Sequence, residues 1–159
     1  MNQDPDLSTF SELTVYENYC MAVYKQKGAC TPTKIQAIEY LQAYNPKFAL
    51  RIDSPCKRLS GGERQALGLA LCLMHKPQLV LLDEHTSALD PAISKNLMEL
   101  TASRLALSGS SAIICTHQLS DALQFGNRLL FMRQGRIAAD YNAQEKEHLT
   151  KEDLLKLYT

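Results

Sequence analysis

The chain has 159 residues, of which 45% are apolar, and this suits about one domain with a hydrophobic core. Lysine plus arginine and aspartate plus glutamate balance at 17 each, so no net charge favours nucleic acid or an anionic membrane. The longest apolar stretch, Leu67 to Met74, is too short to span a bilayer, and the acidic, polar N-terminus does not resemble a secretory signal.

The five cysteines form no Cys-x-x-Cys pair, and their number is odd. Both facts argue against a disulfide framework and against a zinc site. We therefore expect reduced thiols in an intracellular protein.

The first third of the chain predicts helices. Apolar residues at helical spacing predict a helix from Leu13 to about Lys27, which Gly28 would stop. A second helix is expected to begin with Thr31 as its cap and Pro32 at its first position, and to end at Asn45. Its buried face is expected to contain Ile35, Ile38 and Leu41.

From residue 46 on, strand signals alternate with helices. A loop over 46–58 leads into a predicted helix from Gly61 to His75, and Leu79–Leu82 predicts a buried strand of the kind found in parallel sheets. Asp90-Pro91 predicts a helix that Gly109 closes. The remaining expected elements are a buried strand at Ala112–Cys115, a helix at Leu119–Phe125, an antiparallel hairpin of Leu129–Met132 and Ile137–Tyr141, and a helix at Lys151–Tyr158 with Thr150 in its capping box.

Residues 59–65 read Leu-Ser-Gly-Gly-Glu-Arg-Gln at the start of a predicted helix. The Ser60-Gly61-Gly62 turn can aim unpaired N–H groups and a hydroxyl along the helix axis, where the positive dipole end attracts anions. Glycines let the backbone approach a phosphate closely. Alone, such a turn is more often an ordinary helix cap, but the full string with a strand 20 positions later favours an anion site.

Asp83 and Glu84 end the predicted strand at the edge where α/β sheets bind ligands. Adjacent strand side chains point opposite ways, so one carboxylate can hold magnesium through water while the other polarises an attacking water. A solvated acidic turn is the alternative. His117 follows the next strand and is able to contact a γ-phosphate, although a core or cap histidine is the commoner explanation.

The other polar candidates are weaker. His75, His85 and His148 show no metal-ligand spacing and are treated as structural. From its neighbours in the sequence, Asp90 is expected to be a helix N-cap, with a contact across a subunit interface as the alternative. No Gly-x-x-x-x-Gly-Lys-Ser/Thr loop, which cradles phosphates in many nucleotide hydrolases, occurs in the 159 residues.

Together these motifs resemble those of ABC (ATP-binding cassette) ATPases, which power membrane transporters. Leu59–Gln65 matches the signature motif, Leu79–Glu84 the Walker B motif and Ser87–Asp90 the D-loop, while His117 matches the switch histidine. Gln3, with Asp4-Pro5 behind it, looks like the Q-loop that leads into a helical subdomain.

The resemblance implies an α/β, P-loop NTPase-like ABC ATPase core that is partial, without N-terminal strands and P-loop, together with a helical subdomain. We expect three regions: the Q-loop and helical subdomain at 1–60, the signature helix and partial core at 61–142, and a C-terminal helix at 143–159.

The resemblance to this family also implies a nucleotide site shared by two cassettes that face each other head to tail. The implied catalytic residues are Glu84, as general base, and His117, as a contact to the γ-phosphate. Asp83 would hold Mg²⁺ through water, and Gln3 would link the metal and nucleotide site to a transmembrane partner. The implied ATP-binding residues are Gln3, Ser60, Gly61, Gly62, Glu63 and Asp90, the signature residues acting on the ATP of the opposite cassette.

The implied function is that of the ATP-binding and ATP-hydrolysing subunit of an ABC transporter for bacterial solute uptake, with ATP and Mg²⁺ as cofactors. His85 stands where many members have proline, a variant that we associate with uptake of amino acids or similar solutes. The implied partners are transmembrane permease subunits and a second cassette, not nucleic acid, and the implied location is cytoplasmic, at the inner face of the membrane.

Because Walker A is absent, we expect this chain alone to bind ATP weakly and to hydrolyse none at a meaningful rate. Because the family's first strands are also missing, we expect uncovered sheet edges and core faces, which favour self-association or poor solubility. Two alternatives stay open. A non-hydrolysing partner would supply its signature motif to another cassette in trans. A non-transport ABC protein is less favoured, because the chain has neither coiled-coil heptads before Leu59 nor a basic excess.

Overall fold

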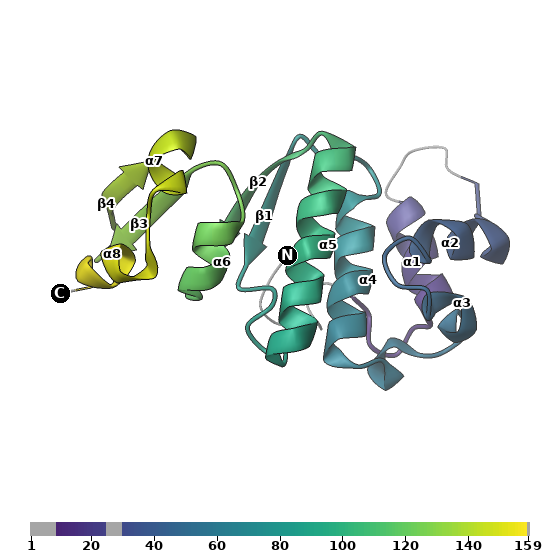
Figure 1. Ribbon diagram of the computed structural model, residues 1–159. Helices are drawn as coiled ribbons and strands as arrows, with labels where there is room; N and C mark the ends of the chain where they lie inside the picture. Colours follow the sequence, from purple (N-terminus) through teal and green to yellow (C-terminus); the bar gives the residue numbers. More distant parts are fainter. Residues whose placement is uncertain (1–8, 25–29, 159) are drawn as a thin grey trace. The chain divides into compact units, whose positions relative to one another are not determined.

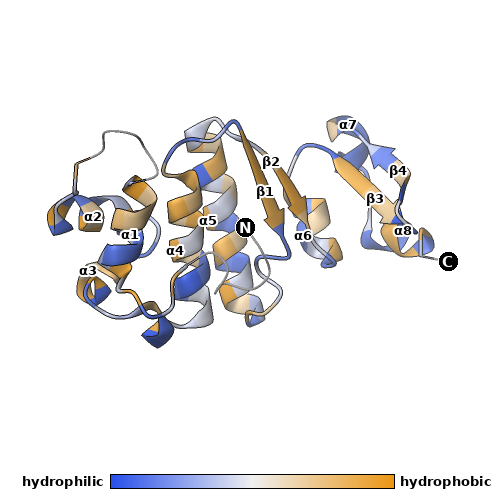
Figure 2. Cartoon of the chain, turned by 180° about the vertical axis from the view of Figure 1, so that it is seen from behind, coloured by the Kyte–Doolittle hydropathy of each residue, from blue (hydrophilic) through white to orange (hydrophobic). Residues whose placement is uncertain are grey.

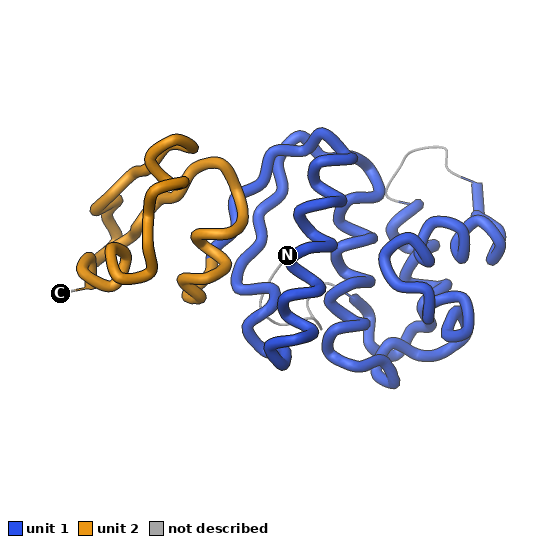
Figure 3. Tube along the Cα trace, in the orientation of Figure 1, with its two compact units in different colours: residues 1–115 blue, residues 116–159 orange. Residues whose placement is uncertain are grey.

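The computed structural model describes residues 9–24 and 30–158, and its contacts divide the chain into two compact units, residues 1–115 and 116–159 (Figures 1 and 3). Gln3 and the expected helix stop at Gly28 lie outside the described residues. None of the described helices combines the length and the apolar character needed to cross a membrane.

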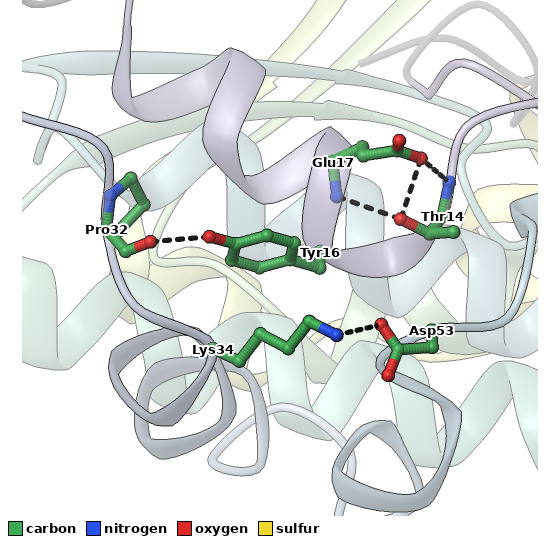
Figure 4. A network of polar contacts seen from close by, with 6 residues as sticks. All are labelled: Thr14, Tyr16, Glu17, Pro32, Lys34 and Asp53. Atoms are coloured by element: carbon green, nitrogen blue, oxygen red, sulfur yellow. Dashed lines mark hydrogen bonds and ion pairs between the residues drawn. The ribbon is translucent and has the colours of Figure 1, made fainter.

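The first described helix of unit 1 is α1, Val15–Val23, which hydrogen bonds hold at its N-terminus and through the side chain of Tyr16. The Thr14 hydroxyl accepts a hydrogen bond from the Glu17 N–H at 3.1 Å, and the Glu17 carboxylate accepts one from the Thr14 N–H at 2.8 Å (Figure 4). This capping box satisfies donors that the first turn would otherwise leave unpaired. The Tyr16 hydroxyl donates to the Pro32 carbonyl oxygen at 2.6 Å and holds the segment before the next helix.

Helix α2 spans Lys34–Leu41, so the prediction that Thr31 caps it is wrong. Thr33 is the cap, because its side chain and that of Gln36 form a reciprocal capping box. The expected buried face is also partly wrong: Ile35 is 69% exposed, whereas Ala37 and Leu41 are fully buried. Tertiary contacts therefore bury a different stripe of α2 from the one that its sequence predicts.

The segment predicted as a loop over 46–58 contains two short helices, α3 at Phe48–Arg51 and η2 at Cys56–Arg58. It also pairs with the start of α1, since the N–H groups of Val15 and Tyr16 donate to the carbonyl oxygens of Ser54 and Ile52. The segment is thus part of the packed helical region.

The central part of unit 1 has two parallel strands, β1 (Leu79–Asp83) and β2 (Ser111–Cys115), packed against helices α4 (Gly61–Leu73) and α5 (Pro91–Ser108) (Figure 1). The parallel pairing and the α/β class are as predicted. One core joins both layers and includes Leu67, Leu69, Val80, Leu82, Leu97 and Leu105. Gly109, with φ of 69°, closes α5 as expected.

The prediction that both strands are wholly buried is wrong. Val80 and Leu82 face the helices, but Leu79, Leu81 and Ile113 are 52%, 58% and 54% exposed. The two-stranded sheet is therefore covered on one face only within unit 1.

Unit 2 contains helix α6 (Leu119–Gln124), strands β3 (Leu129–Arg133) and β4 (Arg136–Tyr141), and helices α7 (Ala143–Glu147) and α8 (Lys151–Lys156). The antiparallel hairpin is confirmed, and its two turn residues, Gln134 and Gly135, both have positive φ, as a tight hairpin turn requires. Thr150 caps α8 as predicted. The region expected to hold one C-terminal helix holds two.

Candidate functional site

The signature turn is built around Ser60, which caps α4. Its side-chain oxygen accepts a hydrogen bond from the Glu63 N–H at 3.3 Å, and the Glu63 carboxylate accepts one from the Ser60 N–H at 2.8 Å. Glu63 is 8% exposed, so this box is part of the packed structure. The N–H groups of Gly61 and Gly62, at the first two helical positions, point out of the helix end because an α-helix offers them no internal acceptor.

The two glycines of the turn are also packing positions. A Cβ on Gly61 would lie 3.2 Å from Cδ2 of Leu89, and one on Gly62 would lie 2.5 Å from Cγ2 of Ile93. Only glycine lets the first turn of α4 approach the beginning of α5 this closely. The signature turn and the D-loop segment before α5 are therefore in direct contact.

Asp90 caps α5, and its Oδ1 accepts a hydrogen bond from the Ile93 N–H at 3.1 Å. Pro91 occupies the first helical position, where its missing N–H costs nothing. The local interpretation of Asp90 as an N-cap is confirmed, and its place at a subunit interface stays a prediction. Because α4 and α5 touch at their first turns, two helix N-termini lie side by side.

Asp83 and Glu84 stand at the carboxyl end of β1. Asp83 is exposed and pairs in register with Cys115, which is exposed too. Glu84 is partly buried and has φ of 42°, a left-handed backbone that non-glycine residues rarely adopt. Its N–H donates to the Cys115 carbonyl oxygen at 3.0 Å, and its own carbonyl oxygen accepts from the Ser87 hydroxyl at 2.8 Å. These bonds turn the chain sharply just where the two carboxylates leave the sheet.

His85 anchors this acidic turn to α5. It is 1% exposed, and its Nε2 lies 3.2 Å from the Thr101 Oγ1. Because the Thr101 hydroxyl donates to the Leu97 carbonyl oxygen at 2.7 Å, His85 Nε2–H is the donor in the histidine contact. Burial lowers the pKa of His85 to about 4, so the ring is neutral near pH 7.

The structural assignment of His85 is confirmed, and that of His75 is as well, since its Nε2 lies 2.9 Å from the Ala22 carbonyl oxygen. Sequence reasoning missed the positioning role of His85. The signal for it was the place of His85 directly after the Asp83–Glu84 pair.

Two further candidates, His117 and Gln3, lie outside the described part of unit 1. His117 follows β2 by two residues and belongs to unit 2, ahead of α6. The Gln118 N–H after it donates to the Thr116 hydroxyl oxygen at 3.0 Å, which fixes the local turn. Gln3 lies outside the described residues. The structure thus joins the signature turn to the D-loop and leaves the roles of His117 and Gln3 as predictions.

The donor set suits a nucleotide with a hydrated cation. Among the described residues, no group of three or more His, Cys, Asp and Glu side chains is arranged to hold a metal ion. A single exposed carboxylate such as Asp83 fits Mg²⁺, which keeps most of its water shell in proteins. The outward N–H groups of Gly61 and Gly62 fit a phosphate oxygen.

An α/β core with a glycine turn at a helix N-terminus and an acidic pair at a strand end is the arrangement expected of ATP-binding cassette proteins. The ABC transporter family pattern matches residues 1–87, and the chain therefore belongs to this family.

The chain is similar to the tyrosine transport ATP-binding protein of Clostridioides difficile, with 36% identity over 161 residues, covering 98% of this chain and 64% of the relative. Among solved structures it is similar to cbiO1 of Clostridium perfringens, part of the ABC transporter complex cbiONQ, with a TM-score of 0.74 and 23% identity, covering 98% of this chain and 60% of the other. A dimeric, post-hydrolysis structure of the ATP-binding cassette MJ0796 bound to ADP and Pi matches with a TM-score of 0.72 and 23% identity, covering 89% and 62% of the chains. The chain thus spans less than two thirds of these proteins.

Proposed function

We propose that these residues are part of the ATP-binding subunit of an ABC transporter that imports a small solute. The observation that carries the proposal is the contact between the signature turn and the start of α5, with Gly62 directly against Ile93. A seven-residue segment, 84–90, joins that helix start to the end of β1. Glycine turn, acidic pair and D-loop are therefore linked within unit 1 by short, packed connections.

The chemistry that this arrangement supports is hydrolysis of ATP. When Mg²⁺ is bound, it supplies positive charge beside the phosphates, and Asp83 would hold it through water. Glu84 would accept the proton of the attacking water. Its backbone is fixed by bonds to Cys115 and Ser87, so its carboxylate leaves the sheet from a defined position. His117 would contact the γ-phosphate.

The signature residues would act on a second cassette. Ser60, Gly61 and Gly62 would bind the ATP held by the opposite cassette, and Asp90 would lie at the interface. The capping box uses the Ser60 oxygen as an acceptor and leaves its hydroxyl hydrogen able to donate to a phosphate. The dimeric MJ0796 structure supports this arrangement by its fold.

The proposed membrane partner is a permease, reached through Gln3 and through the helices between residues 13 and 45. Apolar side chains are exposed on and beside these helices, and they include Phe10, Met21, Tyr24, Ile35 and Leu50. We place the protein at the cytoplasmic face of the membrane, and the tyrosine transport relative favours an amino acid or a similar solute.

A covalent chimaera tests this function. The part of the tyrosine transport relative outside the matched residues would be fused to this chain, and ATP hydrolysis would be measured with and without Mg²⁺. We expect hydrolysis that Glu84→Gln abolishes while ATP binding persists. Hydrolysis that survives Glu84→Gln would contradict the proposed base.

Calorimetry of the 159-residue chain alone provides a second test. Because the sequence contains no Gly-x-x-x-x-Gly-Lys-Ser/Thr loop, we expect no detectable Mg-ATP binding. Tight binding that is lost in Asp83→Ala would mean that these residues hold phosphate by other means, and the roles above would need revision.

A second function, that of a non-hydrolysing partner, is favoured by one observation. The signature turn is complete in this chain, capped by Ser60 and Glu63 and packed on α5. Mixing the chain with a full-length cassette separates the two functions. Only a true partner would change the ATPase rate of that cassette, and Gly62→Ala should remove the change.

A further inference from the structure

The segment that follows β1 combines a strained backbone with buried polar side chains. Figure 2 shows the chain changing from apolar to hydrophilic where β1 ends. Glu84 has φ of 42°, which is unfavourable for a non-glycine residue and persists only where the surrounding structure holds it. His85 and Thr86 come next, and they are only 1% and 4% exposed. The buried side chains of this segment are thus placed to hold Glu84 in its conformation.

Hydrogen bonds fix both peptide groups that flank the Glu84 Cα. The Glu84 N–H donates to the Cys115 carbonyl oxygen at 3.0 Å, and the Glu84 carbonyl oxygen accepts from the N–H and the hydroxyl of Ser87 at 3.0 and 2.8 Å. The bond from the Ser87 N–H closes a four-residue turn with His85 and Thr86 at its centre. Connecting segments usually run over the surface, but both central side chains of this turn enter the core. The turn is therefore held from inside as well.

The contact that holds the turn from inside joins His85 to Thr101, in the middle of α5. His85 Nε2 lies 3.2 Å from the Thr101 Oγ1, and Thr101 is fully buried. The Thr101 hydroxyl is oriented by its own bond to the Leu97 carbonyl oxygen at 2.7 Å, so its oxygen is left to accept from the His85 N–H. Because α5 has 18 residues and shares a core with α4, Thr101 is carried by a packed helix.

We propose that His85 and Thr101 are positioning residues for Glu84: their hydrogen bond holds the turn that directs the Glu84 carboxylate at the attacking water. The inference rests on the proposed function, in which Glu84 is the general base, and extends it to a residue in the middle of α5. A displacement of about 1 Å can cost about a hundredfold in rate. Since neither positioning residue needs to touch ATP, loss of their bond should lower kcat and leave the KM for ATP unchanged.

ATP hydrolysis by the chimaera with the tyrosine transport relative provides the first measurement. Thr101→Val removes the hydroxyl with little change of shape, and His85→Asn places no N–H at the Nε2 position. We expect each variant to lower kcat by about tenfold or more while KM stays within about twofold. The double variant should be no slower than the slower single variant, because both substitutions remove the same bond.

Conservative variants separate positioning from a general loss of structure. Thr101→Ser keeps the hydroxyl and should keep kcat within about twofold, and His85→Gln, which places an amide N–H near the Nε2 position, should restore most of the rate lost in His85→Asn. Ser103→Ala is the matched control on the same helix. Its hydroxyl also donates to a backbone carbonyl oxygen, that of Leu100 at 2.8 Å, but on the exposed side of α5, so kcat should not change.

Hydrogen exchange of the 159-residue chain provides a second measurement, which needs no ATP. We expect Thr101→Val to speed exchange of the Glu84 and Ser87 N–H groups by about tenfold or more, because the turn opens locally. The Gln42 N–H, bonded to the Ile38 carbonyl oxygen at 2.9 Å, is the reference and should exchange at its original rate. An equal increase at all three groups would report global unfolding and would count against the proposal.

Three further results would overturn the proposal. They are an unchanged kcat in Thr101→Val, an equal loss of kcat in Thr101→Ser or Ser103→Ala, and an unchanged exchange rate of the Glu84 N–H in Thr101→Val. An unaltered chimaera that hydrolyses no ATP would reject the proposed function, and with it the catalytic part of this inference. An active chimaera whose kcat does not depend on Thr101 would leave the proposed function standing and reject this inference alone.

Discussion

Replacing Gly62 by alanine tests whether close packing requires glycine in the signature turn. The added Cβ would lie 2.5 Å from Cγ2 of Ile93, whereas unbonded carbon atoms prefer separations of about 3.5–4.0 Å. Relief therefore needs a displacement of about 1 Å between the first turns of α4 and α5, or a strained rotamer of Ile93. Overpacking of this kind costs about 1–3 kcal/mol, and alanine recovers at most about 1 kcal/mol through its helix propensity.

We expect Gly62→Ala to lower the free energy of unfolding by about 1–2 kcal/mol, measured by urea denaturation. Ile93→Ala removes the clashing methyl group, so the double variant should be more stable than Gly62→Ala alone, with a coupling energy of about 1–2 kcal/mol. Gly109→Ala is the matched control: its φ of 69° causes strain, but no atom lies within 4 Å of the added Cβ, so Ile93→Ala should not rescue it. A Gly62→Ala chain as stable as the original, or one that Ile93→Ala fails to rescue, would refute the reasoning.

Three further predictions concern stability. Burial lowers the pKa of His85 from 6.5 to about 4, so between these pH values the unfolded chain binds more protons than the folded chain. The contribution of neutral His85 to the free energy of unfolding is therefore fully present above pH 6.5 and falls by up to about 3 kcal/mol toward pH 4. His85→Asn should make the midpoint of urea unfolding depend less on pH over this range. An unchanged pH dependence would contradict the role of His85 as a buried, neutral histidine. The Asn18 side chain, 2% exposed, accepts a hydrogen bond from the Phe10 N–H at 2.7 Å and donates one to the Phe10 carbonyl oxygen. Asn18→Ala should therefore lower the free energy of unfolding in urea by about 2–4 kcal/mol. A loss below about 1 kcal/mol would argue against a stabilising role of these two hydrogen bonds. Asp53→Asn removes the ion pair with Lys34, in which both side chains are more than half exposed (Figure 4). It should lower the free energy of unfolding by less than about 0.5 kcal/mol in the same assay, and a larger loss would show a further structural role of Asp53.

Local signals predicted much of the secondary structure. The capping box at Thr150, the Asp90–Pro91 helix start and the Gln134–Gly135 turn each depend on residues within a few positions of one another. Such signals act through hydrogen bonds and φ preferences that short segments already possess. The order of the motifs also predicted the family, which the matched pattern over residues 1–87 confirms.

The errors have two causes, a local signal that was missed and tertiary packing. Thr31 and Thr33 are both acceptable caps by type, and the reciprocal bond with Gln36 selects Thr33. Ile35 belongs to an apolar stripe by spacing, yet the neighbouring helices bury Ala37 instead. Leu81 lies in an apolar run and is still 58% exposed, because burial depends on which elements cover a strand.

The sequence by itself determined the motifs, the element types and the chemical character of the candidate site, since side-chain chemistry and local backbone preference are properties of short segments. Only the tertiary structure decided that Gly61 and Gly62 pack on the D-loop and the start of α5, and that His85 is neutral and bonded to Thr101. Both results depend on contacts between residues about 16 to 31 positions apart, which no local pattern encodes. Close packing and desolvation arise only when such segments meet, and they turn a recognisable motif into a site of defined geometry.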